Sequence, residues 1–495
     1  MSESPRTDLD RLADDLGRLV RRLSERVEDG DGGGVRLVGD LISEHLGEDA
    51  AGMPVVRAEF LAWDQANLQI ALDHAFARDG WSSEAVGMAG HARHFSGTGI
   101  GDIVRMGPHF PAGSVEYAEV PVGPGRTMAC IDFAVLLVTS PRGPLVVFLH
   151  RGEENHFQQA SDIELQVAAA DRAAAEELIA DLRRLIQEHD VFRGQVITIE
   201  SSPQGTRLVF AERPAMDAAD LVLPEGTIER IERHVAGPSV HREKLLAMGR
   251  HMSRGLLLYG PPGTGKTHTV RYLTGRLRDA TVIILAGGAL GAIGAFGTVA
   301  RRLAPSVVIL EDVDLVAEDR YAMMGGGNVL FELMDQMSGL ADDADVAFVL
   351  TTNRPEALEP ALAARPGRVD LAVEIPLPDA TARRRLLDLY GRGLDLRLDD
   401  ADAVVTRTEG VTASFMKELL RKAAIVALEA DREHVTDADM AAALDELLSD
   451  GAALTRVLLG SGGDDQTRPG ADWMERFPQW EGSSATIVTW ESDDG

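Results

Sequence analysis

The chain has 495 residues, of which 45% are hydrophobic, 5% aromatic and 26% charged, and its formal net charge is −30 at pH 7. This length suits about three domains, and the acidic balance argues against a nucleic-acid motor because phosphate binding requires a cationic surface. The single cysteine, Cys130, excludes an intrachain disulfide, and no apolar run approaches the ~18 residues of a membrane-spanning helix. We therefore expect a cytoplasmic protein with no membrane partner.

Residues 1–34 are predicted to form an N-terminal helix followed by a Gly-rich linker. Leucines recur over 9–23 at spacings of three and four, which favours an amphipathic helix on its own domain over a coiled coil of about three heptads. The linker 28–34 reads EDGDGGG, a composition typical of a flexible segment.

Residues 35–213 are predicted to form an α+β domain of unknown role. Two apolar runs, 126–139 and 144–150, are joined by a Pro-containing turn. An amphipathic helix is expected over 168–189, and the runs 196–200 and 206–210 are typical of paired strands. No catalytic pattern appears in this domain, so we expect it to select the substrate.

The pattern changes in the next segment, 214–378, which alternates short apolar runs with helices. Continuous apolar runs are expected for a parallel sheet buried on both faces. These runs are 256–259, 282–285, 307–310 and 348–351. Residues 379–458 are predicted to be helical, and 459–495 to be a disordered acidic tail whose tryptophans act as anchors.

Residues 260–267 read GPPGTGKT and match the phosphate-binding pattern GxxxxGK[ST]. A strand is predicted before this loop and a helix after it. Glycines let backbone N–H groups surround phosphate oxygens, and the helix N-terminus adds positive potential. We expect Lys266 to reach the β- and γ-phosphates and the Thr267 hydroxyl to reach Mg²⁺. The predicted nucleotide-binding residues are Gly260, Pro261, Pro262, Gly263, Thr264, Gly265, Lys266, Thr267 and His268.

Two acids, Glu311 and Asp312, directly follow the apolar run 307–310 in the sequence VVILEDVD. A strand that ends in two acids is the Walker B arrangement, in which one acid holds the Mg²⁺ shell and the other orients the attacking water. The usual order is Asp then Glu, and here it is reversed. We assign Glu311, with Thr267, to the metal and Asp312 to the water. The alternative is a solvent-facing acidic strand end.

Polar residues further along the chain complete the predicted site. Asn353 ends a strand in VLTTNRP, where its amide can hold the nucleophilic water. Arg365 and Arg368 follow in ARPGRVD, on a Pro-Gly turn beyond the sheet. From there they suit a neighbouring subunit's nucleotide, where an arginine stabilises the transferring phosphoryl group. The alternative is an intersubunit or surface salt bridge, which we expect to be the main role of one of the pair.

The motifs GPPGTGKT, LEDVD, TTNRP and ARPGRVD, in this order, resemble the AAA ATPase family. The lead-in RGLLLYG (254–260) and the reversed Glu311–Asp312 pair resemble its Bcs-type branch. The resemblance covers 220–455 and implies a P-loop NTPase fold, a parallel α/β sheet with a helical AAA lid. It also implies ATP and Mg²⁺ as cofactors, a homo-oligomer that is commonly a hexamer, and lid residues 410–414 near the nucleotide.

The chain departs from this family's patterns in three features. The membrane segment of Bcs-type proteins and the HExxH site of AAA proteases are absent from the sequence. The loop that grips polypeptide in AAA unfoldases normally carries an aromatic residue, whereas residues 290–297 read LGAIGAFG. We expect an ATP hydrolase that remodels or assembles a protein substrate. The alternative is an ATP-gated oligomeric scaffold with slow hydrolysis, and a nucleic-acid motor is disfavoured by charge.

Overall fold

The computed structural model describes residues 36–47, 50–89, 99–106, 109–151, 163–202, 205–285, 293–314, 344–356 and 369–449. The predicted N-terminal helix and linker, the tryptophan tail, Arg365 and Arg368 lie outside these residues. The described residues form two compact units. The first draws on Met1–Leu221, Glu225–Tyr259 and Lys266–Glu374, and the second on Val222–Pro224, Gly260–Gly265 and Ile375–Gly495.

The N-terminal part of the first unit is an antiparallel sheet of seven strands in the order β1-β7-β6-β5-β2-β3, with β4 paired to β5. The predicted runs 126–139 and 144–150 are the central strands β5 and β6, joined by a tight turn. The strands are β1 Val55–Phe60, β2 Ser82–Met88, β3 Ala112–Gly113, β4 Glu116–Gly123, β5 Arg126–Ser140, β6 Gly143–Arg151 and β7 Ile163–Ala169.

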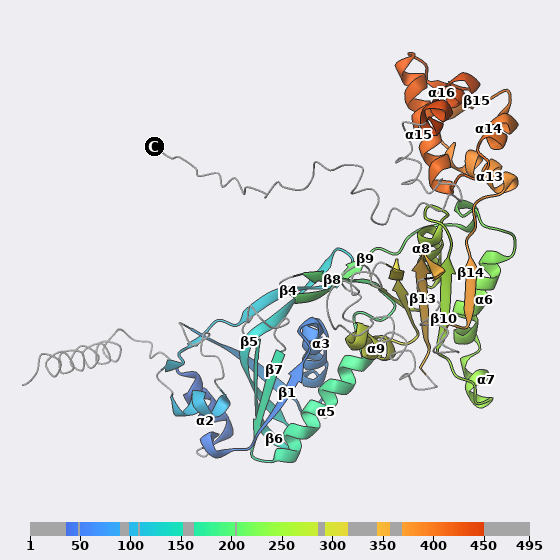
Figure 1. Cartoon of the computed structure of the whole chain (residues 1–495). Helices are drawn as coiled ribbons and strands as arrows, with labels where there is room; N and C mark the ends of the chain where they lie inside the picture. Colours follow the sequence, from blue (N-terminus) through green and yellow to red (C-terminus); the bar gives the residue numbers. More distant parts are fainter. Residues whose placement is uncertain are drawn as a thin grey trace, which may run out of the picture. The chain divides into compact units, whose positions relative to one another are not determined.

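Helices cover both faces of this sheet. Alternate residues of β6 enter two different cores: Leu145 and Val147 pack with α3 (Gln65–Phe76) and α5 (Arg172–Glu188), whereas Val146 and Phe148 pack with α2 (Val38–Leu46) and α4 (Ile100–Arg105). Figure 1 shows α3 and α5 side by side against this sheet. The period of two along a strand produces this division, and the predicted α+β class is confirmed.

The helix predicted over 168–189 begins later than expected. Strand β7 continues to Ala169, and α5 starts at Arg172 after the N-cap Asp171, whose side chain accepts a hydrogen bond from the Ala173 N–H at 3.0 Å. An aspartate cap satisfies an otherwise unpaired N–H group of the first turn. Short 3₁₀ turns occur at Ala50–Gly52, Ala62–Asp64 and Ala218–Asp220.

The second sheet has seven strands in the order β14-β10-β13-β12-β11-β8-β9. Every pairing is parallel except the β8–β9 hairpin. Strands β12 and β13 are buried at every residue, as the continuous apolar runs predicted. The strands are β8 Val196–Ser202, β9 Gly205–Ala211, β10 Arg254–Tyr259, β11 Thr281–Leu285, β12 Ser306–Leu310, β13 Val346–Thr352 and β14 Leu371–Glu374. The helices of this part are α6 Thr227–Val240, α7 Arg242–Ala247, α8 Lys266–Arg276 and α9 Ile293–Arg302.

Strands β8 and β9 differ from the expected domain grouping. From the sequence, residues 196–200 and 206–210 are predicted to be paired strands of the N-terminal domain. They do pair, but β8 also pairs with β11, so both belong to the parallel sheet. The physical reason is burial, since Ile197 and Ile199 pack in one core with Ile283 and Leu285 of β11.

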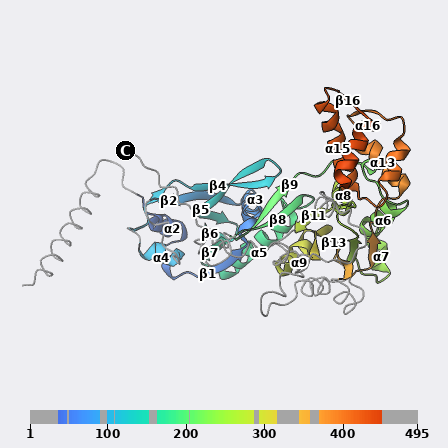
Figure 2. The same ribbon diagram turned by 45° about the horizontal axis from the view of Figure 1, so that its top comes forward.

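The described part of the second unit, 375–449, contains the helices α13 Ala380–Tyr390, α14 Ala401–Arg407, α15 Ala413–Glu429 and α16 Asp437–Leu448. Helices α13, α15 and α16 lie together in Figure 2. Strands β15 Asp395–Arg397 and β16 His434–Thr436 form a short parallel pair in the same unit. The core that the helices share includes Phe415, Leu419 and Met440. These helices match the predicted helical segment. Among the residues that the structure describes, no helix combines the length and the apolar character needed to cross a membrane.

Candidate nucleotide-hydrolysis site

The glycines of the phosphate loop adopt backbone conformations that other residues rarely adopt. The φ angles of Gly260, Gly263 and Gly265 are 141°, 77° and 116°. A Cβ on Gly260 would also lie 2.3 Å from the backbone oxygen of Ile375, a distance no side chain tolerates. Glycine avoids both penalties. Thr264, buried in the loop, donates its hydroxyl to the Pro261 carbonyl at 2.9 Å and so tightens the turn.

The N-terminus of helix α15 contacts this loop within the second unit. Thr412 caps the helix by accepting from the Phe415 N–H at 3.2 Å, and the Ser414 N–H donates to the Gly263 carbonyl at 3.1 Å. Residues 410–414, which the family resemblance relates to the nucleotide, therefore include direct neighbours of the phosphate loop.

Lys266 begins helix α8, and only 5% of the residue is exposed. Burial lowers its pKa from 10.5 to about 8, while Asp312 and Asp314 oppose this shift. Burial disfavours an ammonium ion, and nearby negative charge restores it. The phosphate oxygens of a nucleotide would supply such a charge at this position.

Thr267 and Glu311 meet where α8 begins and β12 ends. The Thr267 hydroxyl donates a hydrogen bond to the Glu311 carboxylate. Burial, followed by the neighbouring Asp312, raises the pKa of Glu311, while Arg271 and the Thr267 hydrogen bond lower it. A hydroxyl and a carboxylate are hard oxygen ligands of the kind that Mg²⁺ takes. The two side chains thus fit a Mg²⁺ site.

The neighbouring strand β13 holds Asp312 in place. Its backbone N–H donates to Thr351 Oγ1 at 3.0 Å, and its Oδ1 accepts from Asn353 Nδ2 at 3.3 Å. The φ angle of Asp312 is 51°, in the left-handed region that aspartate tolerates better than most residues. Such strained conformations concentrate at functional sites.

Asp314 joins the ends of β12 and β13. It is buried, and its Oδ1 accepts from the Thr352 hydroxyl at 2.9 Å and from the Asn353 N–H at 3.2 Å. These contacts fix the backbone at Asn353, whose amide reaches Asp312.

Several of these neighbours were not assigned roles from the sequence: Arg271, Asp314, Thr351 and Thr352. A signal existed for Arg271, which follows Thr267 by four residues on one helix and so shares its face. The two threonines directly precede Asn353, so their position at the strand end was also readable.

The remaining predicted site residues are placed as follows. His268 is half-buried on α8, directly after Thr267. Arg365 and Arg368 lie outside the described residues. Asp370, two residues after Arg368, is tied to Gly255 of β10 by two hydrogen bonds of 3.0 Å.

Comparison with known proteins agrees with this geometry. Residues 256–377 match the family described as "ATPase family associated with various cellular activities (AAA)". The ATP-dependent zinc metalloprotease FtsH of Thermus thermophilus is 32% identical over 268 residues, 50% of this chain and 42% of that protein. FtsH 2 of Symbiobacterium thermophilum is 30% identical over 324 residues, 59% of this chain and 53% of its own.

The proteasome-activating nucleotidase of Thermococcus gammatolerans is 29% identical over 268 residues, 51% of this chain and 67% of that protein. The chain thus spans about half the length of the FtsH relatives it matches, 42% and 53%. The match covers the phosphate loop, the two acids and Asn353 together. Residues 256–377 therefore carry the match to the AAA ATPase family, a family of ATP hydrolases, and the chain is distantly related to FtsH and the proteasome-activating nucleotidases.

Proposed function

We propose that the chain is a Mg-ATP-dependent ATPase that works as a homo-oligomer, a hexamer, and remodels or assembles a protein substrate. The observation that carries the hydrolytic part is the pairing of two contacts, Thr267 with Glu311 and Asn353 with Asp312. Both lie where parallel strands end, the edge at which open α/β sheets bind ligands.

Each side chain has a distinct task in this proposal. Lys266 binds the β- and γ-phosphate oxygens, and Thr267 with Glu311 holds the metal. Bound Mg²⁺ neutralises charge that develops on the phosphoryl oxygens. The Asp312 carboxylate orients the attacking water and accepts its proton, while Asn353 fixes that carboxylate and the water. Arg365 and Arg368 serve the pocket of a neighbouring subunit.

The names of the relatives support a protein substrate. One is called a metalloprotease, a name that gives proteins as its target, and another is called a proteasome-activating nucleotidase, a name that gives the proteasome as its partner. The antiparallel N-terminal domain is proposed to choose the substrate of this chain. The lead-in 254–260 and the reversed acids support a more specific assignment to the Bcs-type branch.

An ATP-gated scaffold with slow hydrolysis is the second candidate. The segment 290–297, LGAIGAFG, has its aromatic residue displaced from the position expected for gripping polypeptide. The two functions differ in whether the action on the partner requires ATP hydrolysis or only ATP binding. An Asp312→Asn form that binds ATP without hydrolysing it would still assemble a scaffold complex, whereas remodelling would stall with the substrate bound.

The first experiment is steady-state ATP hydrolysis by the purified chain with and without Mg²⁺. We expect Mg²⁺-dependent turnover that Lys266→Ala abolishes together with nucleotide binding. Lys244→Ala, a change of the same type at an exposed helix α7 position, is the matched control and should behave as the wild type. Native ATP affinity in Lys266→Ala would contradict the role of Lys266, and a wild type without hydrolysis would contradict the proposed function.

A further inference from the structure

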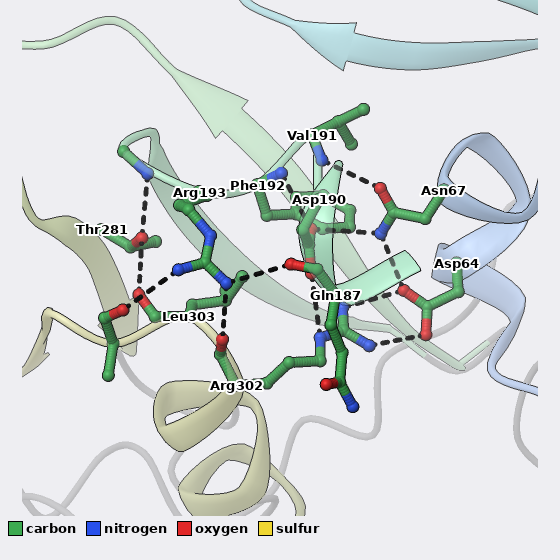
Figure 3. A network of polar contacts seen from close by, with 12 residues as sticks. Asp64, Asn67, Gln187, Asp190, Val191, Phe192, Arg193, Thr281, Arg302 and Leu303 are labelled. Atoms are coloured by element: carbon green, nitrogen blue, oxygen red, sulfur yellow. Dashed lines mark hydrogen bonds and ion pairs between the residues drawn. The ribbon is translucent and has the colours of Figure 1, made fainter. Parts of the chain in front are cut away.

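A buried charge network joins the N-terminal antiparallel domain to the parallel sheet within the first unit (Figure 3). Arg302, the last residue of α9, forms a two-pronged contact with Asp64, with both nitrogen–oxygen distances 2.8 Å. Its Nε lies 2.9 Å from Asp190 Oδ2. The exposed fractions of the Arg302, Asp64 and Asp190 side chains are 18%, 6% and 0%, so water screens these contacts weakly.

Asn67 of α3 holds the two carboxylates together by hydrogen bonds. Its Nδ2 donates to Asp64 Oδ1 at 2.9 Å and to Asp190 Oδ1 at 3.1 Å. Its Oδ1 accepts from the Val191 N–H at 2.9 Å. Asp64 precedes α3 and Asp190 follows α5, so both helices that cover one face of the antiparallel sheet contribute to a single arginine site.

A second arginine holds the end of the same helix. Arg193 donates to the carbonyl oxygens of Arg302 at 3.2 Å, Ala304 at 3.3 Å and Gln187 of α5 at 3.1 Å. A cation suits a helix C-terminus, where carbonyl groups lack partners within the helix. The end of helix α9 is therefore held in two ways, through the Arg302 side chain and through backbone carbonyl groups at and just after Arg302.

Helix α9 is in turn bonded to the strand that carries the catalytic acids. The Ser306 hydroxyl of β12 donates to the Ala300 carbonyl of α9 at 2.7 Å, and both residues are buried. Val299, Ala300 and Leu303 share a core with apolar residues of β12. Glu311 and Asp312 follow directly at the far end of this strand, which is about 17 Å long at the usual rise per residue.

We propose that Arg302 is a positioning residue through which the N-terminal domain holds the base of β12, so that the placement of this domain sets the rate of ATP turnover. The inference rests on the proposed ATPase function. Two carboxylates share one cation, so loss of Arg302 leaves both of them buried without their counter-charge. The helix end then keeps only its carbonyl contacts with Arg193, and β12 loses part of its fixed base. The acids shift relative to the phosphate-binding residues, which lowers kcat more than it weakens ATP binding.

The test compares Arg302→Met with the wild type in the full-length protein. We expect kcat to fall about 3- to 30-fold, the usual range for a coupling residue, with KM for ATP within about twofold. Arg184→Met is the matched control, because Arg184 also pairs with two acids but is half exposed on α5. It should retain wild-type kcat. An Arg302→Met enzyme with unchanged kcat would overturn the inference, while a wild type without hydrolysis would instead overturn the proposed function.

A variant whose network carries no charge distinguishes a positioning role of Arg302 from a purely stabilising one. In Arg302→Met combined with Asp64→Asn and Asp190→Asn, no buried charge lacks a partner, and we expect the melting temperature to recover while kcat stays low. Recovery of kcat together with the melting temperature would reduce the network to a stabilising role and overturn the inference. If Arg302→Met does not fold, Arg302→Lys carries the test. Lysine keeps the charge but lacks the fork that reaches both acids, so a folded Lys enzyme with wild-type kcat would overturn it as well.

Discussion

The side-chain amide of Asn353 donates a hydrogen bond of 3.3 Å to Oδ1 of Asp312. The two residues follow neighbouring parallel strands, β13 and β12, and the Asp312 backbone is bonded to Thr351 of the same neighbour at 3.0 Å. The carboxylate is thus oriented by the adjacent strand as well as by its own. This arrangement suits a carboxylate that must hold a water molecule in one direction.

Replacing Asp312 should separate ATP binding from ATP hydrolysis. Asparagine keeps the shape of the side chain but cannot accept a proton, so we expect Asp312→Asn to bind ATP normally and to lose about 10²- to 10⁴-fold in kcat. Single-turnover hydrolysis and ATP binding by a fluorescent analogue measure the two quantities. Asp388→Asn, at a largely exposed position on α13, is the control.

Replacing Glu311 should instead alter the metal dependence. Glu311→Gln keeps the contact with Thr267 but lowers the negative charge on the metal ligand, so the Mg²⁺ concentration for half-maximal activity should rise. Titration of activity with Mg²⁺ at saturating ATP checks this. If Glu311→Gln instead loses kcat at every Mg²⁺ concentration and Asp312→Asn shifts the Mg²⁺ titration, our roles for these two acids are reversed.

The lowered pKa of Lys266 predicts that ATP affinity depends on pH. Without nucleotide the pKa is about 8, so Lys266 is charged at pH 7 and about nine-tenths neutral at pH 9. Bound phosphate favours the charged form and raises this pKa. Binding at pH 9 must therefore take up about one proton, and the dissociation constant should rise up to about tenfold per pH unit above pH 8.

Isothermal titration calorimetry in buffers of different ionisation enthalpy measures this proton uptake. Equal dissociation constants and no proton uptake between pH 7 and pH 9 would contradict the lowered Lys266 pKa.

The sequence predicted the parallel sheet well because a strand that is buried on both faces is a continuous apolar run in the sequence. Strands β12 and β13 are buried throughout and mostly apolar, and each is followed directly by a polar residue that the motifs identify, Glu311 after β12 and Asn353 after β13. The order of the strands within the sheet has no such local sequence pattern. The pairing of β8 with β11 joins residues 86 positions apart, so the local pattern around Ile197 could not indicate which sheet it enters.

The candidate site was predictable as a set of residues but only partly as a set of contacts. The order of Lys266, Glu311 and Asn353 along the chain suggested a shared sheet edge. The hydrogen bond between Asn353 and Asp312 requires β13 to lie next to β12. This neighbourhood is known only from the strand order of the sheet. Arg302 and Asp64 are 238 residues apart, and nothing near either residue indicates the other.

Arg365 and Arg368 are predicted to act on the nucleotide of a neighbouring subunit. The proposed hydrolysis needs positive charge at the γ-phosphate, and an arginine supplied by a neighbour is typically worth about 10³-fold or more in kcat. Turnover per subunit should therefore rise with protein concentration through the range in which the chain assembles. Arg365→Ala and Arg368→Ala should each bind ATP but hydrolyse it slowly.

Mixing two inactive variants gives the sharper test of this action between subunits. Arg368→Ala keeps an intact pocket, and Lys266→Ala keeps an intact arginine, so a mixed oligomer contains some complete sites. Partial recovery of ATP hydrolysis on mixing is the expected result, and the recovered rate should depend on the mixing ratio because only adjacent unlike subunits form such sites. Arg368→Ala mixed with Arg365→Ala/Arg368→Ala is the control and should stay inactive, since no subunit in that mixture supplies Arg368. A dilute monomer with full activity would contradict action in trans, because its phosphate site would then reach full turnover without any neighbour.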